Sequence, residues 1–234
     1  MRKDPYTVGS YVHIVKRGTR GMNIVRDESD RWRFLRLIRY LNDDNVPRNW
    51  EREVTSAHIR RGFERPDEWN DQTPYVSVLA YCLMDNHFHL LVQEKKEGGI
   101  SKFMQRLCTS MSLHFNAKYH EEGTLFQGAF KARTIESDRH LQYLAAYIQV
   151  KNPFERYPGG ILRATREFDR ALEWVMADPF SSLADYLGSR KSPLLDYEAL
   201  RDVFEEADRF EDFARDVIEG RLERDEGVDE LLLD

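Results

Sequence analysis

The sequence has no long apolar run and very few cysteines. No stretch of 18 consecutive apolar residues occurs in its 234 residues, so we expect no membrane span. Its first residues lack the apolar core of a secretion signal, and we expect a cytoplasmic protein. Cys82 and Cys108 both lie in apolar segments, as buried thiols in a reducing compartment do. Neither is part of a C-x-x-C zinc pattern, and no internal repeat or low-complexity tract is found.

Charge is distributed unevenly along a chain that is otherwise able to form a packed core. Hydrophobic residues make up 41% of the sequence, with 13 Phe, 11 Tyr and 4 Trp. Residues 154–234 hold 11 Lys/Arg and 22 Asp/Glu, a net charge of −11, whereas residues 1–153 have a net charge of +5. The basic front part permits a polyanionic partner, although a solvated surface of mixed charge gives similar totals.

An apolar run at residues 81–93 contains two histidines two positions apart. On a β-strand, His87 and His89 point to the same face, while Phe88, Leu90 and Val92 point to the other. Two neutral imidazoles on one rigid face form half of a divalent-metal site. The alternative is an ordinary pair of histidines in a half-buried strand.

The order of apolar patterns predicts an α+β fold. We expect strands at 11–16, 75–84, 87–93 and 123–135, and helices at about 29–41, 100–119 and 138–151. Ser29 or Asp30 is expected to cap the first helix, and Asn152-Pro153 to end the last. This order is typical of a ferredoxin-like antiparallel sheet with helices packed on one face.

The remainder of the chain reads as an acidic helical extension. We expect a first domain at residues 1–160 and a C-terminal extension at 161–234. Helices are predicted at about 165–177, 180–187 and 196–219, followed by an acidic, frayed end at 220–234. No cluster of catalytic residue types is found in this part.

Four segments, in this order, resemble a known enzyme family. Residues 81–92 (YCLMDNHFHLLV), 114–118 (HFNAK), 123–131 (GTLFQGAFK) and 147–153 (YIQVKNP) resemble the HUH transposases that use a single catalytic tyrosine. These include the transposases of small insertion sequences and the REP-associated tyrosine transposases. The resemblance covers roughly residues 8–160. Residues 178–188 (DPFSSLADYLG) also look like the tail of the REP-associated type.

The resemblance implies the HUH endonuclease fold and the cleavage and joining of single-stranded DNA. His87 and His89 would hold a Mg²⁺ or Mn²⁺ ion, and Tyr147 would attack the scissile phosphate to leave a 5′-phosphotyrosine link. Tyr143, one helical turn earlier on the same face, is the rival nucleophile, but Tyr147 matches the position of the motif.

The sequence departs from the family pattern at two places. Relatives usually have proline where this chain has Asp85, which is either a turn substitution or an added carboxylate near the metal. Relatives also place the third metal ligand four residues after the tyrosine, whereas Asn152 is five residues after Tyr147. Asn152 is the first candidate for this ligand and Gln149 the second. A bulge in the helix, or the helix end, could restore the geometry.

The implied partner is single-stranded DNA with a hairpin. Six basic side chains are candidate phosphate contacts: Arg17, Arg20, Lys102, Arg106, Lys131 and Arg133. The long tail favours a monomer over a homodimer. One alternative function is a non-catalytic regulator with this fold that binds hairpin DNA or RNA, and another is an unrelated metal-dependent hydrolase.

Overall fold

Four strands form one sheet in the computed structural model, which describes residues 6–56, 63–196, 200 and 207–220. The strands are β1 (Tyr11–Arg17), β2 (Val76–Leu83), β3 (His87–Glu94) and β4 (Lys131–Ile135). Their order is β2–β3–β1–β4, and every neighbouring pair is antiparallel. With α1 (Glu28–Leu41) between β1 and β2, and α3 (Gly99–Tyr119) between β3 and β4, this is the ferredoxin-like arrangement. The expected α+β class is confirmed.

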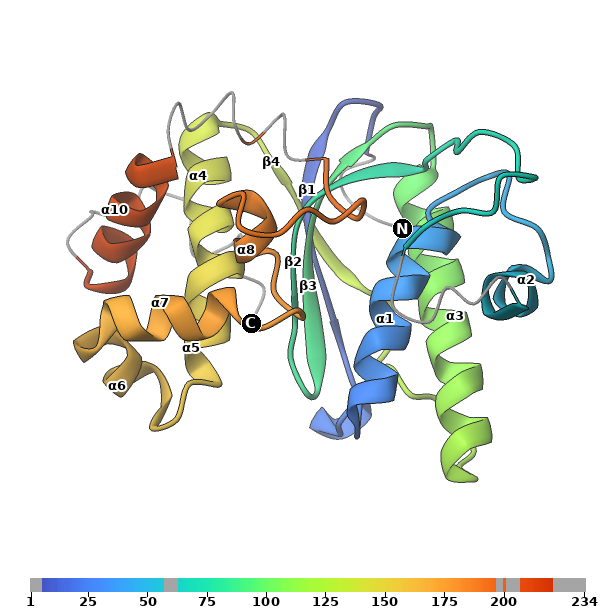
Figure 1. Cartoon of the computed structure of the whole chain (residues 1–234), viewed down its shortest axis with the longest axis horizontal. Helices are drawn as coiled ribbons and strands as arrows, with labels where there is room; N and C mark the ends of the chain where they lie inside the picture. Colours follow the sequence, from blue (N-terminus) through green and yellow to red (C-terminus); the bar gives the residue numbers. More distant parts are fainter. Residues whose placement is uncertain (1–5, 57–62, 197–199, 201–206, 221–234) are drawn as a thin grey trace.

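The two connecting helices, α1 and α3, cover one face of the sheet (Figure 1). Phe88, Leu90 and Val92 of β3 lie in the same apolar cluster as residues of both helices. Phe34 of α1 packs on Phe88 with ring centroids 4.9 Å apart. The face predicted for these three β3 side chains is therefore the one they occupy.

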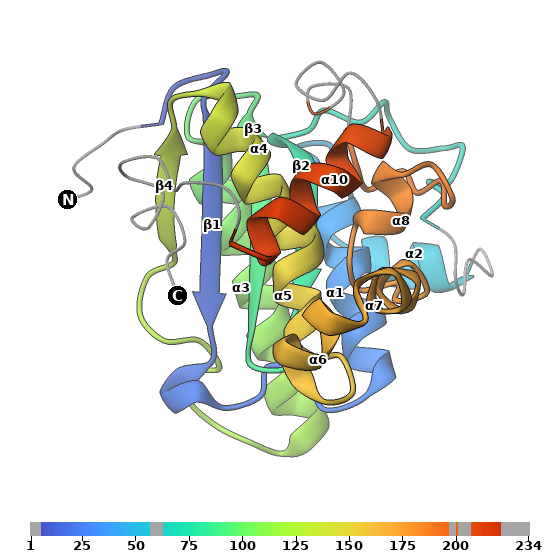
Figure 2. The ribbon, with the colours of Figure 1, turned by 90° about the vertical axis from the view of Figure 1, so that its left-hand side faces the viewer.

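The opposite face of the sheet is covered as well, so the sheet lies between two helical layers (Figures 1 and 2). This second layer contains α4 (Asp138–Ala146), the π-helical turn η2 (Tyr147–Lys151), α5 (Asn152–Glu155), α6 (Gly160–Arg166), α7 (Phe168–Met176), α8 (Leu183–Tyr186) and α10 (Ala207–Ile218). In Figure 2, α4, α5 and α10 lie in front of β2 and β3, with β1 and β4 to their side.

The helix of the nucleophile candidates does not end at Asn152-Pro153, as the sequence led us to expect. After the π-helical turn it continues as α5, with Pro153 in its first turn. Proline has no amide hydrogen to give the Gln149 carbonyl four residues earlier, and this carbonyl accepts from the Ser181 hydroxyl at 3.5 Å instead. Ser137 caps the start of α4, since its side chain accepts from the His140 amide at 3.2 Å.

The C-terminal segment is fastened along the outer side of β2. The Leu83 amide donates to the Phe180 carbonyl at 3.0 Å, and the Ser182 amide to the Tyr81 carbonyl at 3.0 Å. The described helices beyond residue 160 also share one apolar cluster with α4 and β2. The division into two domains at residue 160 stays a prediction. The expectations for 197–199, 201–206 and 221–234 fall outside the described residues.

Strand β4 is shorter than predicted, because it begins only at Lys131. Residues 124–130 instead cross the end of β1, where the Thr19 amide donates to the Leu125 carbonyl and the Gln127 amide to the Arg17 carbonyl, both at 2.9 Å. Buried Lys16 also donates to the Gln127 and Gly128 carbonyls. These contacts hold the segment as a loop against β1.

The first helix begins earlier than expected, and its start is joined to the end of α3. Asp27 is the N-cap, since its carboxylate accepts from the Asp30 amide at 3.0 Å. Lys118, in the block that resembles the transposases, donates to the carboxylates of Asp27 and buried Asp30 and to the Ser29 hydroxyl, each at 2.7 Å. Lys118 therefore has a structural role between α1 and α3.

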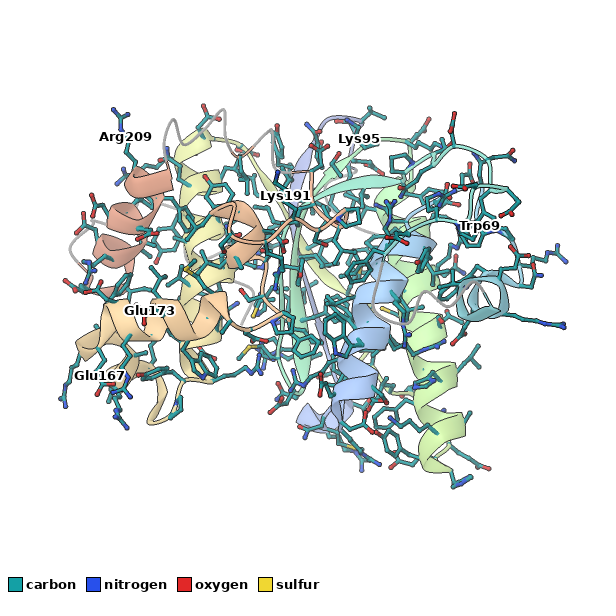
Figure 3. All side chains as sticks on the ribbon, in the orientation of Figure 1. Trp69, Lys95, Glu167, Glu173, Lys191 and Arg209 are labelled. Atoms are coloured by element: carbon teal, nitrogen blue, oxygen red, sulfur yellow. The ribbon has the colours of Figure 1, made fainter. Side chains whose placement is uncertain are left out.

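Glu173 of α7 is exposed, and Glu167, between α6 and α7, is half-buried. Figure 3 shows Glu167 and Glu173 at the side of α6 and α7 that is away from the sheet. None of the described helices has the length and apolarity needed to cross a bilayer.

We predict that Lys118→Met lowers the free energy of unfolding by about 1–3 kcal/mol, because it leaves the buried Asp30 carboxylate with fewer hydrogen bonds. Lys102→Met, at an exposed position of the same helix, should change it by less than about 0.5 kcal/mol. Urea unfolding of both variants measures this, and equal values for the two would contradict the assignment.

Candidate functional site

Strand β3 places His87 and His89 side by side on the face covered by the second helical layer. Their ring centroids are 4.9 Å apart at an interplanar angle of 72°. On β1, Arg17 lies opposite His87 and Val15 opposite His89. His87 is 8% exposed and His89 is fully buried, so both rings are held by packing.

Both imidazoles are neutral at pH 7. Burial, with smaller effects from the Arg17 and Lys151 charges, lowers the pKa of His87 to about 4. Burial, followed by the neighbouring His13 and His87, lowers the pKa of His89 well below its usual value. Neutral imidazoles keep the lone pairs that bind metal ions, so these pKa values suit a metal site.

The turn before β3 fixes the orientation of the His87 ring. Nδ1 of His87 lies 2.6 Å from Oδ1 of Asn86. Because an amide oxygen only accepts, Nδ1 carries the proton and Nε2 keeps its lone pair. The Asp85 carboxylate forms an ion pair with Arg31 of α1. The sequence allows Asp85 to be either a turn substitution or an added carboxylate near the metal. Because its carboxylate is paired with Arg31, the turn substitution fits better.

Tyr147 is the first residue of η2, and its ring lies 6.0 Å from that of His89, centroid to centroid. Lys151 extends back over the tyrosine, with Nζ 4.7 Å from the ring centroid and 3.5 Å from the hydroxyl. The same ammonium group donates to Glu155 at 2.6 Å. Tyr143, the rival candidate, is also buried and accepts through its carbonyl from the Tyr147 amide.

The additional residue between Tyr147 and Asn152 is taken up by the π-helical turn. The Asn152 amide donates to the Tyr147 carbonyl, five residues earlier, whereas an α-helix makes this bond at four. Asn152 therefore follows Tyr147 by one turn, the relation that a spacing of four gives in an α-helix. Of the two possibilities that the sequence allowed, a bulge in the helix or the helix end, the structure has the bulge.

Asn152 and Gln149, the two candidates for a third metal ligand, differ in their contacts. The Gln149 side-chain oxygen accepts from the Ser182 hydroxyl at 3.0 Å. Asn152 is 1% exposed, and the buried amide nitrogens of both residues have no hydrogen-bond partner among the described residues, so the occupied oxygen of Gln149 is the difference. The oxygen and nitrogen of a side-chain amide are assigned from their hydrogen-bond partners. The two atoms can exchange places by rotation of the amide, so the oxygen of Asn152 can face a cation. Asn152 therefore fits a metal better.

Three of the six basic side chains lie on the sheet face of the histidines. Lys131 is opposite Val15, and Arg133 opposite His13, so both point to the same face as Arg17. A pocket of about 310 Å³ lies here, lined by Val15, Arg17, Gln127, Gly128, Ala129 and Lys131.

The other three basic side chains are elsewhere. Arg20 is exposed in the turn after β1, and Lys102 and Arg106 are on α3, in the first helical layer. Arg106 donates to the Asp43 carbonyl and the Tyr75 hydroxyl. DNA contacts at all six positions stay predictions.

Two residues of the site had no role in the sequence interpretation. His13 of β1 is buried with its Nε2 3.0 Å from Nδ1 of His89, and Lys151 contacts the Tyr147 hydroxyl. His13 lies two positions before Val15 and four before Arg17, so strand alternation alone places it on their face. No signal in the sequence places its ring against a residue 76 positions away.

One family model matches the part of the chain that contains the site. Residues 52–151, under half of the chain, match the family described as Transposase IS200 like, and this segment contains His87, His89 and Tyr147. This segment of the chain is similar to the IS200-like transposases. The resemblance inferred from the sequence is thereby confirmed.

The comparisons with solved structures and with curated proteins give little further information about the family. The solved structure of a REP-associated tyrosine transposase bound to a REP hairpin is similar at 11% identity and a TM-score of 0.41, over 83% of this chain and 88% of that one. No curated protein matches the chain.

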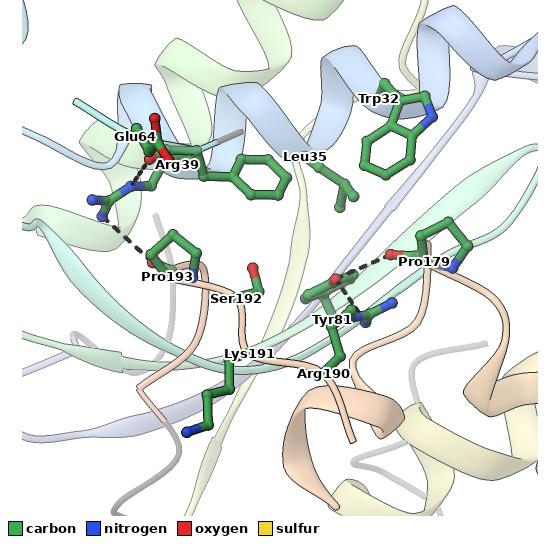
Figure 4. A pocket seen from close by; sticks show the side chains of 11 residues that line it. Trp32, Leu35, Arg39, Glu64, Tyr81, Pro179, Arg190, Lys191, Ser192 and Pro193 are labelled. Atoms are coloured by element: carbon green, nitrogen blue, oxygen red, sulfur yellow. Dashed lines mark hydrogen bonds between the residues drawn. The ribbon is translucent and has the colours of Figure 1, made fainter. Parts of the chain in front are cut away.

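A larger cavity of about 500 Å³ lies between α1 and the C-terminal segment (Figure 4). The two arginines in its wall, Arg39 and Arg190, are already engaged. Arg190 donates to the Asp185 carboxylate at 2.6 Å, and Arg39 to the carbonyls of Phe63 and Pro193. The Tyr81 hydroxyl donates to the Pro179 carbonyl at 3.1 Å. These contacts fasten the C-terminal segment to the sheet and to α1.

We predict that stability falls in acid because of the buried histidines. A folded-state pKa near 4 for His87 means that the unfolded chain binds more protons below pH 6.5, so the free energy of unfolding decreases as the pH falls from 6.5 to about 4. His87 alone should contribute a loss of about 2 kcal/mol between pH 7 and pH 5.

Urea unfolding at pH 7, 6 and 5 with a chelator present measures this dependence. His87→Gln should have a shallower dependence than the wild type, whereas His140→Gln, at a half-buried position of α4, should keep it. If the His87→Gln curve runs parallel to that of the wild type, the pKa assignment is wrong.

Proposed function

We propose that this protein is a metal-dependent enzyme that cleaves and rejoins single-stranded DNA through a tyrosine. The observation that carries the proposal is the Tyr147 ring packed 6.0 Å from the His89 ring, centroid to centroid, with the His87 ring next to it. A nucleophile and two neutral imidazoles thus meet where a sheet and a helix pack, and rigid elements of this kind hold reacting groups in place.

The proposed Mg²⁺ or Mn²⁺ ligands are His87, His89 and Asn152. Asn86 directs the lone pair of His87 through Nε2, and the π-helical turn places Asn152 one turn beyond Tyr147. Both candidates have a buried amide nitrogen without a partner among the described residues, but the Gln149 oxygen is occupied by Ser182, which favours Asn152. Nitrogen and amide-oxygen donors of this type suit Mn²⁺ well and Mg²⁺ less well. When bound, the ion would polarise the scissile phosphate and offset its charge.

In the proposed reaction, the Tyr147 oxygen forms a bond to phosphorus and the bond from phosphorus to the 3′ oxygen breaks. The phenol proton leaves to solvent and the departing 3′ oxygen takes one up, so the step is balanced. A phenol is a weak nucleophile at neutral pH because its pKa is near 10. The Lys151 ammonium, 3.5 Å from the hydroxyl, would stabilise the phenolate.

The proposed partner is single-stranded DNA that carries a hairpin, as the family resemblance implies. Arg17, Lys131 and Arg133 share the face of the histidines, and the 310 Å³ pocket beside them could receive the phosphate backbone. These three residues are therefore the first DNA contacts to test. Arg20, Lys102 and Arg106 remain proposed contacts of lower priority because of their positions.

We predict that Tyr147→Phe abolishes a covalent protein–DNA adduct. Full-length protein is incubated with Mn²⁺ and a labelled, hairpin-bearing single strand, and the products are separated on a denaturing gel. The wild type should give a DNA-linked band, and Tyr143→Phe should retain it.

Each other outcome would assign a different function. Loss of the band only in Tyr143→Phe would move the nucleophile, cleavage without an adduct would indicate a hydrolase, and binding without cleavage would indicate a regulator.

We predict that Lys151→Met slows adduct formation roughly 10²-fold at saturating DNA, because it removes the cation beside the phenol oxygen. Lys151→Arg should lose less, since it keeps the charge. Single-turnover rates measure the effect, with Lys95→Met, at an exposed position that has no proposed DNA contact, as the matched control. Equal rates for Lys151→Met and the wild type would exclude a role for Lys151 in the chemistry.

A further inference from the structure

His13 of β1 lies against the histidine that is deepest in the site. Its ring stacks on the ring of His89 with centroids 5.3 Å apart and an interplanar angle of 16°. Nε2 of His13 is 3.0 Å from Nδ1 of His89, and both residues are fully buried. A hydrogen bond between two buried side chains fixes both rings, because neither nitrogen can exchange its partner for bulk water.

The hydrogen bond leaves only one nitrogen of His89 for a metal ion. Nδ1 is engaged with His13, so Nε2 is the atom that can coordinate. A coordinating Nε2 has no proton, and the single proton of a neutral imidazole must then be on Nδ1. Nδ1 of His89 is therefore the donor, and Nε2 of His13 the acceptor. His13 in turn carries its own proton on Nδ1.

His87 supports this reasoning, because the same arrangement is found there with an unambiguous partner. Its Nδ1 faces the Asn86 oxygen, which cannot donate. Each of the two proposed ligands is thus held at Nδ1 by a neighbouring side chain and offers Nε2. For His87 the partner comes from the preceding residue, and for His89 from a different strand.

We propose that His13 is a positioning residue for the metal site, whose Nε2 accepts from His89 and sets the tautomer that coordinates the ion. This inference rests on the proposed metal-binding role of His87 and His89. Partners of this kind typically change metal affinity 10- to 100-fold when they are removed. A neutral acceptor also suits the position, because a carboxylate without any exposed surface would be costly.

Manganese affinity tests the proposal without reference to activity. Isothermal titration of the full-length protein with Mn²⁺ compares the wild type with His13→Phe, which cannot accept, and His13→Gln, whose amide oxygen reaches the position of Nε2. His13→Phe should raise the Kd roughly 10- to 100-fold. His13→Gln should restore most of the affinity, and His140→Gln should equal the wild type. A purely structural role would reduce the folded fraction and leave the Kd unchanged.

The tautomer of His89 gives a second readout that needs no variant of His13. In ¹⁵N-histidine spectra of the metal-free wild type, with His89→Gln for assignment, His89 should have a protonated Nδ1 and an unprotonated Nε2. The reverse pattern would overturn the proposal, as would a His13→Phe variant that binds Mn²⁺ within twofold of the wild type.

The same titrations distinguish an error in the proposed metal site from an error in the role of His13. If the wild type does not bind Mn²⁺, or if His87→Gln and His89→Gln bind as it does, the metal site itself is wrong, and the His13 proposal is overturned with it. If these two variants lose binding while His13→Phe keeps it, only the role of His13 is refuted.

Discussion

Strand β3 is packed on both faces. Its alternating side chains separate the apolar core on one face of the sheet from the histidine site on the other. Phe88, Leu90 and Val92 contribute to the core beneath α1 and α3, and the intervening His87 and His89 point to the other helical layer. A slip of one residue in the register of β3 would place the histidines in the apolar core. Packing of the apolar side chains on one face of β3 thus fixes the position of the two histidines on the other face.

The second constraint is the helix that crosses the histidine face. Tyr147, Lys151 and Asn152 all depend on where α4 packs on the sheet, and Leu144 and Ile148 fix that packing from the buried side of the helix. A π-helical turn is rare, occurs mostly as a single-turn bulge within an α-helix, and is frequent at functional sites. Here it lets the chain carry one additional residue while Asn152 keeps its place one turn after the tyrosine.

Much of the arrangement could be predicted from local patterns. The alternation around His87 and the helical spacing before Tyr147 depend only on neighbours in sequence, and they predicted the strands, the helices and the shared histidine face. The errors came from longer-range contacts. Asp27, rather than Ser29 or Asp30, caps α1. Strand β4 is shortened where residues 124–130 pass over β1, and the helix continues past Asn152-Pro153.

The contacts of His13 with His89 and of Lys151 with Tyr147 needed coordinates, but for different reasons. The first joins two strands that are far apart in sequence, and their register decides which side chains meet. The second lies within one helix, but its geometry depends on a π-helical turn that spacing alone only suggested.

The attachment of the C-terminal segment to β2 has a consequence for the whole sheet. β2 is an outermost strand, and all eight of its residues are buried. An uncovered strand of this composition is a template on which another chain can add strands and start aggregation. The backbone groups of Phe180, Ser182 and Asp196 form hydrogen bonds with the backbone of β2, so fewer groups of this strand remain to pair with another chain. The acidic extension therefore shields the sheet from edge-to-edge association.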